Sequence, residues 1–141
     1  MNLEELLSKN KIRGIKPSKE KASKNLKIAE RDLKATKDLY KHENYDWVLI
    51  TSYNAMLQAA RAYMFYKGYA PRGPHKHLST VQFLRTFENT FEELTIDLLD
   101  RVRKRRHATV YDQPATVSKT EAKKSIDRAE KFVEKVKNEI N

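Results

Sequence analysis

The sequence predicts an all-α fold: an up-and-down bundle of four long helices with one short helical insertion, and so a four- or five-helix bundle. Two observations predict it. Apolar residues recur at spacings of three and four in several long segments, and only three Gly and four Pro occur in 141 residues. No segment alternates apolar and polar residues as a strand does. A chain of this length is expected to form one domain.

The N-terminal segment, residues 1–17, is predicted to be a flexible basic lead-in to a single helical domain at residues 18–141. Asn2 to Ser8 is compatible with a short helix, whereas Lys9 to Pro17 is basic and contains both Gly and Pro. We expect this segment to be a solvated arm, with contact to nucleic acid as the alternative.

Ser18 is a suitable N-cap for the first long helix, which extends to about His42. Its apolar face is Leu26, Ala29, Leu33, Thr36 and Tyr40. The second long helix, residues 45–67, is apolar over most of its surface and is therefore expected at the centre of the bundle. Gly68 is predicted to end it, because glycine adopts the left-handed C′ conformation without strain.

A loop is predicted at residues 70–75, followed by a short helix at about residues 77–87. The next long helix is expected at about residues 89–110, and its predicted core face is Phe91, Leu94, Leu98 and Val102. The last helix is predicted to begin at Ser118, where Ser118 and Glu121 match a capping box.

The formal net charge of +10 favours a nucleic-acid partner, although much of the excess lies in residues 1–41, with twelve Lys or Arg against six Asp or Glu. The absence of Cys excludes a disulfide framework, a thiol nucleophile and a thiolate metal site. No run of about 18 apolar residues is present, and residues 1–11 do not resemble a signal peptide. We therefore expect a soluble cytoplasmic protein without a membrane span.

A basic run from Arg101 to His107 is the strongest functional feature, and two interpretations are open. Because acids precede it on the same helix, the run is compatible with a solvated helix matched to its dipole. Alternatively, Arg103, His107 and Tyr111 form a line opposite the predicted core, with Lys104 beside them. Arg105 and Arg106 are expected to flank the core side. Arginine binds phosphate and histidine transfers protons, so this end of the helix is a candidate RNA site, with Arg103, Lys104 and Arg105 as phosphate-binding residues.

The segment from Asn44 to Gly68 resembles the second helix of HEPN-domain proteins, in particular the small stand-alone bacterial and archaeal members. Residues 77–83 (HLSTVQF) are similar to the short-helix motif of that family, and residues 101–111 and 118–136 resemble its closing half. The resemblance covers roughly residues 20–140. It implies a four- or five-helix bundle that forms homodimers, binds RNA or nucleotide, and in catalytic members cleaves RNA without a metal through an Arg-x4–6-His motif. It also implies a possible partner, because many members pair with a small nucleotidyltransferase as a toxin–antitoxin system.

Two registers of that motif are present. The first carries the family positions onto Arg106, His107 and Tyr111, with His107 as the polar residue after Arg and Tyr111 where the family has its His. The second uses Arg101 and His107, but places Val102 where the family has a polar residue. Two functions are therefore open. The first is a metal-independent ribonuclease toxin, and the second is a non-catalytic partner of a nucleotidyltransferase or a nucleotide-binding assembly module. In the second case the resemblance makes Tyr111 a candidate target of nucleotidylation by the partner. A protein that binds nucleic acid through charge alone is a third possibility.

The loop before the short helix supplies further candidates. His75 and His77 form a His-x-His pair, but their neighbours are Pro, Arg and Lys, so we expect no metal site. His77 is instead predicted to begin the short helix and to line the same candidate RNA site as the basic run, and Arg72 is a candidate RNA contact. No cofactor is expected, because no glycine-rich phosphate loop is present.

Overall fold

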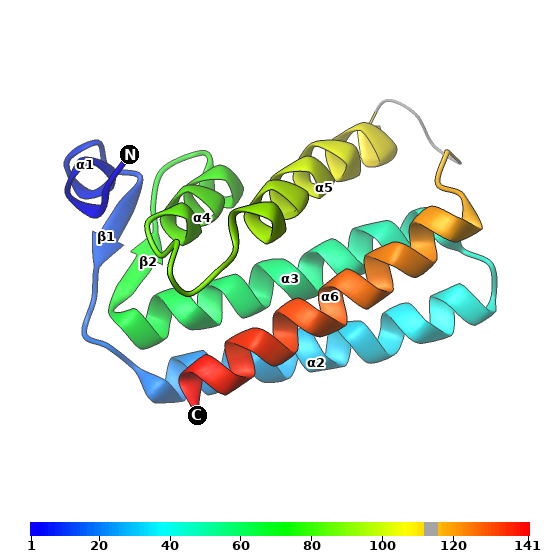
Figure 1. Ribbon diagram of the computed structural model, residues 1–141, viewed down its shortest axis with the longest axis horizontal. Helices are drawn as coiled ribbons and strands as arrows, with labels where there is room; N and C mark the ends of the chain where they lie inside the picture. Colours follow the sequence, from blue (N-terminus) through cyan, green and yellow to red (C-terminus); the bar gives the residue numbers. More distant parts are fainter. Residues whose placement is uncertain (112–115) are drawn as a thin grey trace.

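The computed structural model describes residues 1–111 and 116–141, apart from the side chain of Tyr111. In these ranges the chain forms six helices and two short strands (Figure 1). They are α1 (Leu3–Ser8), β1 (Ile12–Gly14), α2 (Lys19–Lys41), α3 (Tyr45–Lys67), β2 (Tyr69–Pro71), α4 (Lys76–Arg85), α5 (Glu93–Tyr111) and α6 (Lys119–Ile140). The predicted all-α bundle is confirmed.

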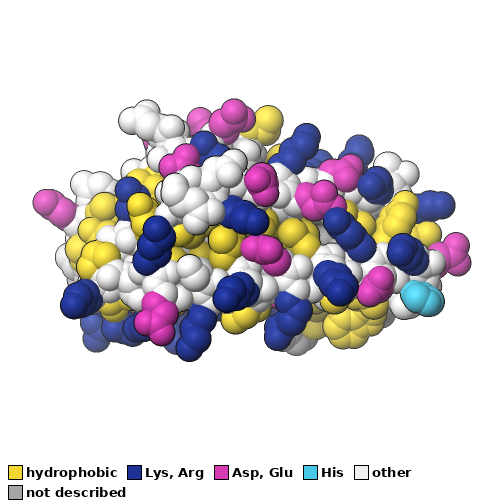
Figure 2. All heavy atoms as spheres, turned by 90° about the horizontal axis from the view of Figure 1, so that it is seen from below, with side chains coloured by type: hydrophobic (Ala, Val, Ile, Leu, Met, Phe, Trp, Pro, Cys, Tyr) yellow, Lys and Arg dark blue, Asp and Glu magenta, His cyan; other side chains and the backbone are white. Residues whose placement is uncertain are grey.

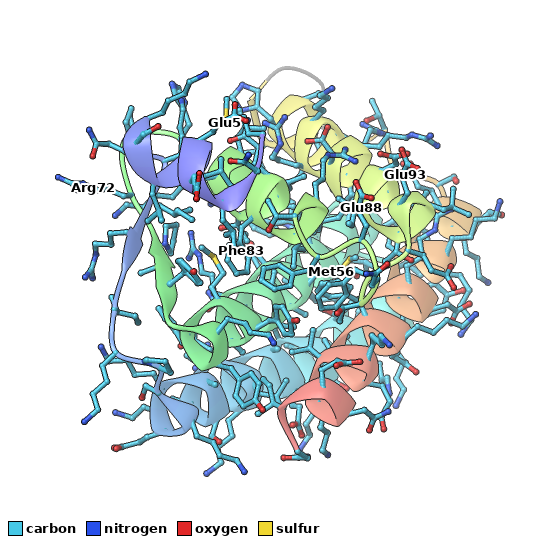
Figure 3. All side chains as sticks on the ribbon, turned by 60° about the vertical axis from the view of Figure 1, so that its left-hand side comes forward. Glu5, Met56, Arg72, Phe83, Glu88 and Glu93 are labelled. Atoms are coloured by element: carbon cyan, nitrogen blue, oxygen red, sulfur yellow. The ribbon has the colours of Figure 1, made fainter. Side chains whose placement is uncertain are left out.

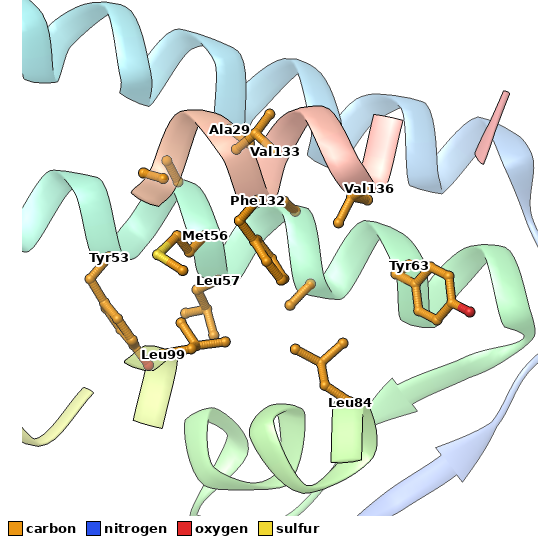
Figure 4. Close-up of a cluster of buried hydrophobic side chains, with 14 of the residues drawn as sticks. Ala29, Tyr53, Met56, Leu57, Tyr63, Leu84, Leu99, Phe132, Val133 and Val136 are labelled. Atoms are coloured by element: carbon orange, nitrogen blue, oxygen red, sulfur yellow. The ribbon is translucent and has the colours of Figure 1, made fainter. Parts of the chain in front are cut away.

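Helix α3 is the centre of the bundle and contacts α2, α4, α5 and α6 (Figure 1). Its fully buried alanines, such as Ala55 and Ala59, allow neighbouring helices to approach closely. Figure 4 shows the core beside it, where Met56 and Leu57 of α3 lie near Leu99 of α5 and Phe132 of α6. The apolar surface on nearly every side of α3 explains why it is the central helix.

The predicted helix ends are confirmed at three positions. The Ser18 hydroxyl accepts a hydrogen bond from the Lys21 amide at 3.1 Å, and the Ser118 hydroxyl accepts one from the Glu121 amide at 3.1 Å. Gly68 ends α3 with φ of 94°, the left-handed conformation expected there.

The N-terminal segment differs from the expected flexible lead-in. Residues 3–8 form α1, in agreement with the short helix that Asn2 to Ser8 allowed, but residues 12–14 form β1, which pairs antiparallel with β2 so that Ile12 lies opposite Pro71. The segment is held because Leu6 and Ile12 are buried almost completely in the core. Leu6 and Ile12 belong to two different short elements, so they formed no single helical or strand period from which this packing could be predicted. The two strands were also not predicted, since each is only three residues long.

Helix α5 begins later than predicted, at Glu93, and its buried face is different. Phe91 and Val102 are buried as expected, but Leu94 is 65% exposed, whereas Ile96 and Leu99 are buried. The reason is that Phe91 lies in the turn before the helix and does not share its phase. The buried stripe therefore runs through Leu99 toward Arg103, four residues later. Arg103 is consequently half-buried, with a side-chain exposure of 25%, and does not lie opposite the core as predicted.

Candidate functional site

A cavity of about 230 Å³ lies between the start of α4 and the second half of α5. We call it the arginine cavity and define it by its lining residues: Pro74, His75, Lys76, His77, Leu78, Arg103, Arg106 and His107. No acidic side chain is among them. By contrast, a larger cavity of about 510 Å³ beside α6 is lined by both acids and bases, including Glu88 and Arg128. The arginine cavity is therefore suited to an anion.

Arg106 is the most unusual side chain of the cavity. Its Nε is buried and has no hydrogen-bond partner among the residues that the structure describes. The same holds for Nε of Arg61 in α3, a residue that is not among the lining residues but whose charge acts on His77. A buried guanidinium donor without an acceptor is costly, by about 1–3 kcal/mol per group. Such a cost is offset when an anion accepts from it.

His77 is held from below by Tyr53, whose hydroxyl lies 3.1 Å from Nδ1 of the imidazole. The two rings are 5.6 Å apart between centroids. Burial lowers the pKa of His77, and the charges of Arg61, Arg106 and Arg103 lower it further. Burial also raises the pKa of Tyr53 to about 12, although the same arginines oppose that shift. At neutral pH the imidazole is therefore uncharged and the phenol keeps its proton.

Arg103 and Lys104 share one carboxylate. Nε of Arg103 donates to Oδ1 of Asp100 at 2.9 Å, and Nζ of Lys104 lies 3.6 Å from Oδ2 of the same residue. Arg103 nevertheless lines the arginine cavity, whereas Lys104 is exposed and does not. Asp100 thus positions Arg103 and neutralises part of the local charge.

The first turn of α4 adds to the positive field. The N-cap residue, His75, makes no side-chain hydrogen bond to the helix, and the first turn contains no acid. His75, Lys76 and His77 all line the arginine cavity. Because a helix N-terminus carries a partial positive charge and free N–H groups, this end of α4 favours an anion as well.

Arg105 has a structural role, unlike the phosphate-binding role predicted for it. It donates to both carboxylate oxygens of Glu121 at 3.2 Å and to the hydroxyl of Thr109 at 2.9 Å. It also donates to the hydroxyl and the carbonyl oxygen of Thr116, at 3.0 and 3.1 Å. These contacts occupy the guanidinium and join α5 to the start of α6.

The remaining predicted residues lie at different distances from this site. His107 lines the arginine cavity and is exposed. Arg101 is exposed and does not line the cavity, so the structure does not bring the second register, Arg101 and His107, together there. Arg72 lines a neighbouring cavity. The Tyr111 side chain lies outside the described residues.

The sequence did not identify Arg61 or Tyr53 as residues of the site. Tyr53 is fully buried, and its hydroxyl contacts His77. Arg61 carried a usable signal, because it is a charged residue within the most apolar helix, between Ala60 and Ala62. A charge at such a position is rare unless it has a partner or a function.

In the described part of the chain, no group of three or more His, Cys, Asp or Glu side chains is placed to hold a metal ion. Likewise, none of the described helices combines the length and the apolarity that crossing a membrane requires.

The chain matches a known protein-family model. A family model described as the HEPN domain matches residues 22–139, which is most of the chain and includes α3, α4, α5 and nearly all of α6. A search of curated proteins found no match.

Proposed function

The chain belongs to the HEPN-domain family, and from this premise we propose that it binds the phosphate backbone of RNA in the arginine cavity. The observation that carries the proposal is that Arg106, whose buried Nε has no hydrogen-bond partner among the described residues, lines a cavity whose described lining residues include no acid. A phosphate oxygen is the acceptor that such a donor needs.

The other groups around the cavity support the same ligand. Arg103 supplies a second guanidinium, and the uncapped start of α4 supplies positive potential. His77 is held uncharged, so its imidazole can hydrogen-bond a phosphate or a ribose hydroxyl without adding a further like charge. RNA presents both of these groups at each nucleotide.

Metal-independent cleavage of RNA is a second candidate function, and one observation favours it: two imidazoles, His77 and His107, line the same cavity as Arg106. In such a reaction one imidazole accepts the proton of the 2′-hydroxyl as that oxygen attacks phosphorus. The bond to the 5′-oxygen breaks, and a proton donor protonates the leaving oxygen. Arg106 would stabilise the charge that grows on the phosphate oxygens. The products are a 2′,3′-cyclic phosphate and a 5′-hydroxyl.

We further propose that the protein acts as a homodimer, as the family resemblance implies. Val110 is 41% exposed and follows His107 by one helical turn, so an apolar contact there would bring two arginine cavities near each other. Light scattering of the wild type and of Val110→Asp tests this: a dimer that Val110→Asp converts to a monomer supports the contact, and a monomeric wild type refutes it.

The binding proposal is tested by fluorescence anisotropy with a labelled single-stranded RNA in the presence of a chelator. Arg106→Met removes the guanidinium but keeps the aliphatic stem. Loss of one charge-assisted contact is worth about 1.5–3 kcal/mol, or roughly a 10- to 100-fold weaker affinity. Arg101→Met is the matched control, because Arg101 is exposed on the same helix and lies outside the cavity. Equal losses in both variants would refute the site.

Cleavage is tested separately by incubating the same RNA with chelator and detecting a 2′,3′-cyclic phosphate. His107→Ala is expected to abolish the product. Binding without any cleavage by the wild type would remove the second candidate function and leave the first in place.

A further inference from the structure

A second basic cavity, of about 260 Å³, adjoins the arginine cavity, and the two share Pro74 and His75 in their linings. Its cations, Lys9, Lys11 and Arg72, lie beside the antiparallel pair of strands β1 and β2. We call it the hairpin cavity after this strand pair, although α2 and α3 lie between the two strands in the chain. The shared residues make the two cavities neighbours on one surface.

The charge of the hairpin cavity is uncompensated. No acidic residue lines it, and none of its three cations forms an ion pair within residues 1–111 and 116–141. Figure 3 shows Arg72 at the edge of the molecule beside the hairpin, pointing away from the core. On the face that is seen in Figure 2, by contrast, acidic side chains lie among the basic ones.

Backbone contacts fix the segments that carry these cations. The Arg72 amide donates to the carbonyl oxygen of Lys11 at 2.9 Å, and the pairing of β1 with β2 continues from there. Asn10 and Gly73 both have positive φ, 55° and 85°, and a Cβ at Gly73 would lie only 3.3 Å from the Asn10 carbonyl oxygen. The two segments therefore meet closely, and the backbone that carries Lys9, Lys11 and Arg72 is held beside the arginine cavity.

We propose that the hairpin cavity is a second phosphate subsite, so that the ligand is an RNA strand of several nucleotides and not a mononucleotide. This inference rests on the proposed function of the arginine cavity. The strand passes from Arg106 over His75 to Lys9, Lys11 and Arg72. His75 is exposed at the junction, where its imidazole offers a surface on which a base can stack.

The test compares uridine monophosphate, a labelled 4-mer and a labelled 12-mer of uridine at several salt concentrations. The hairpin variant carries Lys9→Gln, Lys11→Gln and Arg72→Gln. Its control carries Lys24→Gln, Lys27→Gln and Lys34→Gln, which remove the same charge from exposed positions of α2. Thermal unfolding verifies that both variants are folded, and the single variant Arg72→Gln replaces the triple variant if it is not.

For single strands, the slope of log K against log salt is about 0.7 per neutralised phosphate, so three contacts contribute about 2 to the slope for the 12-mer. We expect the hairpin variant to lose this part of the slope and the tighter binding of the 12-mer, and to bind the mononucleotide like the wild type. The α2 control should keep most of the slope.

Three results would overturn the inference. If the hairpin variant binds the 12-mer as the wild type does while Arg106→Met loses it, the second subsite is wrong but the proposed function stands. If the hairpin variant loses mononucleotide and 12-mer binding equally, the cations do not form a separate subsite. If polyglutamate of equal charge competes as well as the 12-mer, the surface recognises acidic polymers in general and is not an RNA subsite. A fourth result, failure of the wild type to bind any of the RNAs, would remove both this inference and the proposed function.

Discussion

Replacing Arg105 with Met should destabilise the protein and leave RNA binding unchanged. The Met side chain keeps the apolar stem but removes all five hydrogen bonds to Thr109, Thr116 and Glu121. Charge-assisted bonds contribute about 1.5–3 kcal/mol each in buried positions, but these share one guanidinium and are not additive. Arg105 and Glu121 are also 26% and 34% exposed, so solvent screens part of the interaction.

We therefore expect the free energy of unfolding to fall by about 2 kcal/mol, which for a chain of this size lowers Tm by roughly 4–8 °C. Urea denaturation followed by circular dichroism measures the stability, and anisotropy with single-stranded RNA measures binding. Arg101→Met, an exposed residue outside both the cavity and this network, is the control. An Arg105→Met protein that is as stable as the wild type but loses RNA affinity would refute the structural role.

The remaining predictions concern the cavity and the end of α3. Arg106→Met should leave the free energy of unfolding equal or raise it by up to about 1 kcal/mol, because it removes a buried donor without a described partner; a loss of 2 kcal/mol in urea denaturation would contradict this. The folded-state pKa of His77 is depressed below its unfolded value, so the unfolded chain binds more protons and stability should fall as pH decreases through about 6.5 and below. Comparison of pH-dependent melting with His77→Asn, which should show a flatter profile, checks this. Gly68→Ala should lower the free energy of unfolding by roughly 2 kcal/mol, because φ is 94° and the new Cβ would lie 2.9 Å from Cγ of Pro17. A Tm within about 1 °C of the wild type would exclude that strain.

The helical part of the fold was predictable because its signals are local. Ser18, Gly68 and Ser118 mark helix ends through their own backbone and hydroxyl chemistry, and each is found in that role. The phase of α5 was not predictable in the same way. Phe91 is buried but lies in the turn before the helix, so counting helical spacings from it placed Leu94 on the core face instead of Ile96 and Leu99.

The site was predictable in part: the basic run identified Arg106 and His107, and His77 was predicted to begin the short helix beside them, where it does line the cavity. The sequence did not reveal that Tyr53 contacts His77 or that the charge of Arg61 acts on it. These groups are far apart in sequence, and their meeting depends on how the helices pack around α3. The helical rotation of about 100° between Arg105 and Arg106 points the two side chains in different directions. The packing of α6 and α4 then places Glu121 beside Arg105 and the cavity beside Arg106, which is a tertiary effect.

The pairing of Ile12 with Pro71 has a consequence for the order of folding. It closes a loop that contains the whole of α2 and α3, so its entropic cost is higher than that of the short connection between these two helices. We expect α2 and α3 to associate first and the strands to pair late. In native-state hydrogen exchange the amides of β1 should then open before those of α3. A chain at that stage already has Tyr53 and Arg61 in place, but the cations of the hairpin cavity are not yet beside them. The arginine cavity and the hairpin cavity would therefore differ in lifetime as well as in position.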